Sequence, residues 1–118
     1  MKWGPAYVFF LLLICPNIAC AQAGSMHYEI DHLMEYIEGS VCIFVRNGKD
    51  YSPKVAAQHI KKKYNYYKKK ITTTEEFVEL CASKSSMSNK PYIIKCPGQP
   101  LLESQDWFLK ELARIRKK

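Results

Sequence analysis

Apolar residues recur along the chain with two different periods, and these periods predict its helices and strands. Helical spacing defines four segments, which begin near Ser25, Pro53, Thr74 and Ser104. Their apolar stripes are Ile30, Leu33, Met34, Ile37 and Val41; Ala56, Ile60, Tyr64, Tyr67 and Ile71; Phe77, Leu80 and Cys81; and Phe108, Leu112 and Ile115. The expected N-caps, whose hydroxyls can accept first-turn N–H groups, are Ser25, Ser52, Thr73 or Thr74, and Ser104.

Two runs rich in β-branched and aromatic residues, 41–45 and 91–96, predict strands. Asn47-Gly48 directly follows the first run and favours a two-residue hairpin, because both positions accept a positive φ. Residues 49–51 are then a short return strand. The resulting order, α-β-β-α-α-β-α, predicts an α+β fold in which about four helices pack on a small, mainly antiparallel three-stranded sheet.

The N-terminal residues have the pattern of a secretory signal peptide. Lys2 precedes the apolar run 8–14, which is shorter than the about 20 residues that span a bilayer. Ala19 and Ala21 suit cleavage after residue 21, and cleavage after residue 23 is a second register. We expect 1–21 to be a signal peptide and 22–118 a single compact domain with no transmembrane segment. Two alternatives stay open: an uncleaved anchor, and a lipid anchor on Cys20.

Removal of this leader changes the charge and the cysteine count. Without Lys2, 17 basic residues face 11 acidic ones, which suits an anionic partner such as a lipid headgroup, an acidic protein or a glycan. Export argues against nucleic acid. The remaining Cys42, Cys81 and Cys96 allow three pairings. Cys81 falls on a helical core position whereas the other two lie in strand runs, which favours a Cys42–Cys96 disulfide; three buried thiols are the alternative.

Residues 61–70 combine six lysines with three tyrosines, a composition that taken alone suggests nucleic-acid binding. Helical spacing places Tyr64 and Tyr67 on the core stripe, and it places the lysines outside. The segment is therefore expected to be a solvated helix face or an anion-attracting patch.

Motifs for catalysis or metal binding are not found in the sequence. His27, His32 and His59 lack ligand spacing, and the cysteines form no Cys-x-x-Cys pair. No nucleophile elbow surrounds Ser85 or Ser86. The acids considered for paired-carboxylate chemistry all fall on expected helix surfaces or helix starts: Glu35, Glu38, Glu75, Glu76 and Glu79. We therefore expect no enzyme activity, no cofactor and no metal.

Four ordered motifs between about residues 27 and 116 resemble a family of small exported bacterial proteins, the YfeK-like family. They are Phe44-Val-Arg-Asn-Gly48; Ala57-x-His59-x-x-x-Lys63; Ile71-x-Thr-x-Glu75-x-Phe77; and Ala82-x-x-Ser85-Ser-x-Ser-x-Lys90-Pro-Tyr92. The resemblance implies a periplasmic domain of unknown function. It also suggests a candidate binding cluster at one end of the sheet: Arg46, His59, Lys63, Ser85, Ser86 and Lys90. Structural roles in capping and turns are the alternative for these residues.

These observations favour a non-enzymatic module that binds an anionic component or a protein of the cell envelope. A small hydrolase or thiol enzyme is the first alternative, using Cys81 or the Ser85–Ser86 loop near His59. A structural accessory subunit is the second, and it would present a large exposed apolar patch.

Overall fold

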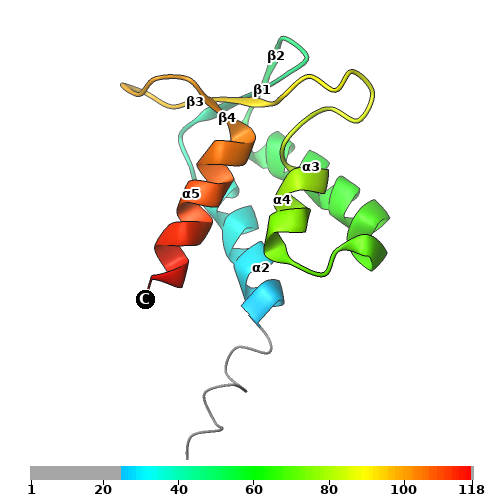
Figure 1. The fold of residues 1–118 in the computed structure, drawn as a ribbon. Helices are drawn as coiled ribbons and strands as arrows, with labels where there is room; N and C mark the ends of the chain where they lie inside the picture. Colours follow the sequence, from blue (N-terminus) through cyan, green and yellow to red (C-terminus); the bar gives the residue numbers. More distant parts are fainter. Residues whose placement is uncertain (1–24, 118) are drawn as a thin grey trace, which may run out of the picture.

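The computed structural model describes residues 25–117, in which four α-helices underlie a small sheet (Figure 1). The predicted signal peptide, both cleavage positions and Cys20 lie outside the described residues. In chain order the elements are α2 (Ser25–Glu38), β1 (Ile43–Arg46), β2 (Lys49–Tyr51), α3 (Pro53–Tyr67), the 3-10 turn η2 (Lys68–Lys70), α4 (Thr74–Cys81), β3 (Ile93–Lys95), β4 (Leu102–Glu103) and α5 (Ser104–Arg116). The predicted α+β class is confirmed.

The sheet has four strands, so the prediction of three is wrong. Their order is β2-β1-β3-β4, and each neighbouring pair is antiparallel. The additional strand contains only Leu102 and Glu103, and Leu102 pairs with Ile94 of β3. A strand of two residues directly before a helix is too short to produce an alternating pattern. Their strand conformation comes from the β3 edge beside them, which no local rule reveals.

The predicted turn and two of the predicted caps are present. Asn47 and Gly48 have φ values of 51° and 78°, as the hairpin between β1 and β2 requires. Ser52 Oγ accepts a hydrogen bond from the backbone N–H of Val55, and Pro53 begins α3. Thr73 caps α4 in a capping box with Glu76.

Two expected positions differ in the structure. Ser104 is not an N-cap: it is the first residue of α5, and its buried hydroxyl donates to Ala82 O at 2.7 Å. Val41 does not continue the stripe of α2, because that helix ends at Glu38 and leaves Val41 78% exposed. The helix therefore ends just before Gly39-Ser40, about one turn before the end of its apolar stripe.

A single core lies between the helices and the inner face of the sheet. Fully buried aromatic and aliphatic side chains come from every helix and from β1 and β3: Leu33, Ile37, Phe44, Ile60, Phe77, Ile94, Phe108 and Leu112. Phe77 of α4 meets Tyr64 of α3 edge-on, at 5.5 Å between ring centroids. Cys81 is also fully buried, as its place on the α4 stripe predicts.

A disulfide joins Cys42, next to β1, to Cys96, next to β3. These two strands are antiparallel neighbours in the sheet, so the disulfide links them at one end of the pair. It links parts of the chain 54 residues apart. Between residues 25 and 117, no helix has the length and apolar content to cross a bilayer.

Candidate functional site

A basic concavity of about 620 Å³ lies between α3, the end of β1 and the loop after α4. Its lining is Arg46, His59, Lys62, Lys63, Tyr66, Tyr67, Ser85, Ser86, Met87 and Tyr92. Five of the six residues in the predicted cluster line it. Lys90 does not line it; the residue before it, Asn89, has a positive φ of 61°. We call this feature the basic concavity.

Helix α3 supplies one side of the basic concavity. His59, Lys62, Lys63 and Tyr66 follow one another at intervals of three, one and three residues, so they share a face of the helix. Arg46 ends β1 immediately before the hairpin turn and reaches the same space. Sequence reasoning did not assign Lys62 or Tyr66 to the cluster, although their spacing from His59 could have revealed them.

Lys63 is held in place by the loop across from it. Its Nζ donates to Lys84 O at 2.8 Å and to Tyr92 Oη at 3.3 Å, and lies 5.3 Å from the centre of the Tyr92 ring. Burial lowers the pKa of Lys63, and the nearby positive charges of Arg46 and Lys84 lower it further. An anion placed here would relieve that repulsion.

His59 lies in the same positive environment. Burial lowers its pKa below the ordinary value of 6.5, and the charges of Arg46 and Lys62 add to this effect. Its ring meets Tyr51 edge-on, at 5.3 Å between centroids. The imidazole is therefore mainly neutral at pH 7 while the concavity holds no anion.

The charges of the basic concavity have one sign. No aspartate or glutamate is among its lining residues. Among the described residues, none of Arg46, Lys62 and Lys63 takes part in a salt bridge. Cations clustered without carboxylates repel each other and attract anions. Tyr66 and Met87, at 80% and 93% exposed, stand at its rim as the two most exposed large apolar side chains of the described chain.

The loop that contains Ser85 and Ser86 is joined to the hairpin by side-chain hydrogen bonds. Ser85 is 1% exposed, and its Oγ lies 3.4 Å from Asn47 Nδ2 and 3.5 Å from Ser88 N. Ser88 Oγ donates to Asn47 Oδ1. Ser85 therefore orders the loop, while Ser86 is exposed.

The described residues give little support to a catalytic cysteine or to a metal site. Burial raises the pKa of the Cys81 thiol to about 11, which leaves little of the nucleophilic thiolate at neutral pH. Over residues 25–117, His, Cys, Asp and Glu side chains nowhere gather in a group of three or more that could hold a metal ion.

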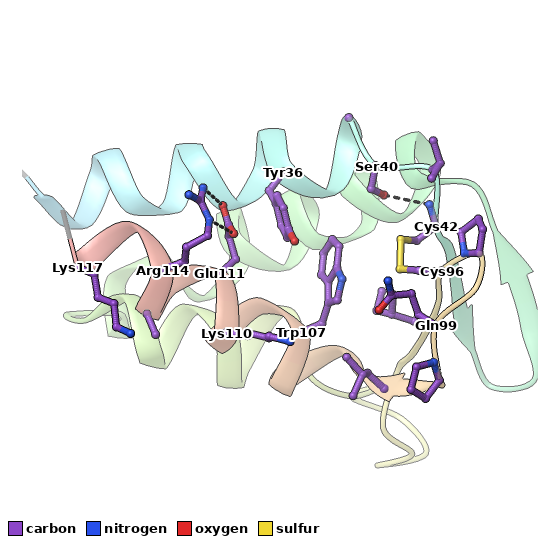
Figure 2. A pocket seen from close by; sticks show the side chains of 17 residues that line it. Tyr36, Ser40, Cys42, Cys96, Gln99, Trp107, Lys110, Glu111, Arg114 and Lys117 are labelled. Atoms are coloured by element: carbon purple, nitrogen blue, oxygen red, sulfur yellow. Dashed lines mark hydrogen bonds and ion pairs between the residues drawn. A yellow bond between two sulfur atoms is a disulfide. The ribbon is translucent and has the colours of Figure 1, made fainter.

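Two buried carboxylates are not among the acids that the sequence pattern singled out. Glu29 is 8% and Glu111 is 5% exposed. Glu111 accepts from His32 Nε2 at 2.6 Å and from two nitrogens of Arg114 at 2.8 Å, the latter pair visible in Figure 2. The Arg114 bonds, more than the His32 bond, hold the pKa of Glu111 below its usual range despite burial. The spacing of Glu29 could have indicated its burial, because it lies four residues before the buried Leu33, on the same face of α2.

Comparison with known proteins identifies relatives but no established activity. Residues 24–116 match a protein family described as a family of unknown function, DUF5329. The "Uncharacterized protein YfeK" of Salmonella typhimurium strain LT2 is 41% identical over 49 residues, which are 42% of this chain and 41% of that protein. The match thus spans about two fifths of that relative. No solved structure matches the chain. The YfeK-like resemblance expected from the motifs is confirmed.

Proposed function

The chain belongs to the DUF5329 family of unknown function, and we propose that it is a non-enzymatic binding module of the cell envelope. Its ligand is an anionic group of the phosphate type, bound in the basic concavity. One observation carries this proposal: Arg46, Lys62 and Lys63 line a single hollow that contains no carboxylate. Guanidinium and ammonium groups are the donors that proteins use for such anions.

An envelope location is part of the proposal. The leader-like pattern of residues 1–21 supports export, and the Cys42–Cys96 disulfide supports an oxidising compartment such as the periplasm.

The absence of catalysis is likewise proposed from the nucleophiles near the basic concavity. Cys81 is fully buried with a raised pKa, and Ser85 is buried in loop hydrogen bonds. Neither hydrogen-bonds to His59 among the described contacts, so an activated nucleophile of the kind that hydrolases use lacks support. The accessory-subunit alternative has weaker support still. Apart from Tyr66 and Met87, which share the rim of the basic concavity, the large exposed apolar side chains are spread along the chain: Tyr28, Val41, Val55 and Leu101.

Titration of the protein with inorganic pyrophosphate in a calorimeter tests this function. We expect saturable binding that weakens with added salt, because screening reduces attraction between charges. Replacing Arg46 and Lys62 together by glutamine should weaken binding by about tenfold, as expected when two solvent-exposed ion pairs are lost.

The matched control replaces Lys68 and Lys69 by glutamine. These lysines are exposed in η2, outside the lining of the basic concavity, and their loss changes the net charge equally. Equal weakening by both double variants would reject a localised site. Phosphatidylglycerol vesicles, tested against phosphatidylcholine vesicles, distinguish a lipid headgroup from a soluble phosphate as the source of the anion.

A further inference from the structure

A second hollow lies on residues that the proposed function does not use. It measures about 860 Å³ and runs between α2, α5 and the end of the sheet that carries the disulfide (Figure 2). This size falls within the range of about 300–1,000 Å³ that is usual for small-molecule sites. We call it the α2–α5 groove.

The middle and one end of the α2–α5 groove are apolar. Tyr36 and Trp107 stack at its centre, with ring centroids 4.5 Å apart. Beyond them lie the Cys42–Cys96 disulfide and Leu102. Figure 2 shows the two rings between the disulfide on one side and charged side chains on the other. These surfaces suit a hydrocarbon chain.

The other end of the α2–α5 groove is positively charged. Lys110 and Arg114 of α5 and the C-cap residue Lys117 follow one another at intervals of four and three residues, on the face that carries Trp107. The one carboxylate in the lining, Glu111, is already bonded to His32 and Arg114. Lys110 and Lys117 form no salt bridge within residues 25–117, so their charges are available to a ligand.

We infer that the α2–α5 groove binds a single-chain amphiphile with an anionic head, of the fatty-acid class. Its hydrocarbon chain lies against Tyr36 and Trp107, and its carboxylate lies by Lys110 and Lys117. The rise of an α-helix places Trp107 and Lys117 about 15 Å apart along α5, which suits an extended medium-length chain.

An extended peptide fits this groove less well. A peptide that adds a strand needs a free sheet edge, and the edge strand here, β4, has only two residues between Pro100 and α5. The remaining contacts are apolar surfaces and cations, which need no backbone partner.

Fluorescence of Trp107 tests the inference with two ligands that share one hydrocarbon chain. In a Trp3→Phe protein, Trp107 is the only tryptophan, so its emission reports on the groove. We expect sodium laurate, kept below micelle formation, to change this emission saturably. Dodecanol, which lacks the charge, should bind at least about fivefold more weakly, the effect of one or two exposed ion pairs.

Two variants assign the contacts to the two ends of the groove. Lys110→Gln with Lys117→Gln should reduce laurate affinity to that of dodecanol, while Lys68→Gln with Lys69→Gln should leave it unchanged. Val41→Asp alters an exposed rim residue, so the fold should persist by circular dichroism while both ligands bind more weakly. No saturable response to laurate, or equal affinity for laurate and dodecanol, would overturn the inference. It stands apart from pyrophosphate binding, so either result can fail alone.

Discussion

Replacing Cys42 and Cys96 together by alanine is expected to lower the free energy of unfolding by about 4 kcal/mol. In the chain-entropy account, a bond across 54 residues removes conformations from the unfolded chain, and a loop of this length corresponds to that value. In this small domain, such a change is a large share of the total stability. Urea unfolding, monitored by circular dichroism, measures it.

A reducing agent separates this effect from the loss of side-chain packing. Dithiothreitol should destabilise the wild-type protein by a similar amount and leave the double variant unchanged. A Cys81→Ala variant keeps the disulfide, so it should still respond to the reductant. Equal stability of oxidised and reduced wild-type protein would contradict this account of the fold.

Arg116→Ala is expected to cost about 2 kcal/mol, the second largest effect. Arg116 bonds to both oxygens of the buried Glu29 at 2.9 Å, and its Nη1 donates to Glu75 at 2.6 Å. Thr74 Oγ1 also donates to Glu29 at 2.6 Å, so one cluster joins α2, α4 and α5. Removing one partner strands a buried carboxylate, and the partial exposure of Arg116 keeps the cost below that of a fully buried pair.

The same cluster predicts how acid acts on the protein. The Arg116 hydrogen bonds lower the pKa of Glu29 below its ordinary 4.5, against the opposing effect of burial. Because the folded-state pKa is the lower one, this stabilisation is present above the unfolded-state value and is lost as the pH falls below it. Urea unfolding from pH 7 to pH 3 should show a shallower loss for Arg116→Ala than for wild type. Arg116→Lys, which keeps the charge but not the paired geometry, should fall between them. Parallel curves for all three would contradict the assignment.

Local signals in the sequence account for much of the fold. Asn47-Gly48 specifies its turn through positive φ values, and Ser52-Pro53 specifies the start of α3 through capping, so neither depends on the rest of the chain. The two-residue strand β4 could not be predicted, because it forms only against β3. Ser104 matched a capping pattern but bonds instead to Ala82, a contact 22 residues away in sequence.

The candidate site could be predicted only where local spacing brings its residues together. His59 and Lys63 share a helix face by spacing alone, and Arg46 joins them because β1 ends at the hairpin. Lys90 does not line the basic concavity, and it follows Asn89, whose positive φ no local pattern predicts. The His32 partner of Glu111 could not be found locally, since it lies 79 residues away, whereas Arg114 is three residues further along α5.

The pKa of His59 with and without a bound anion tests the central claim most directly. Burial, Arg46 and Lys62 lower it in the free protein, so a bound anion should raise it. An NMR titration of the imidazole signals, with and without inorganic pyrophosphate, measures the change. The account predicts an upward shift of the His59 pKa when pyrophosphate is present. An unchanged His59 pKa would contradict anion binding at this site.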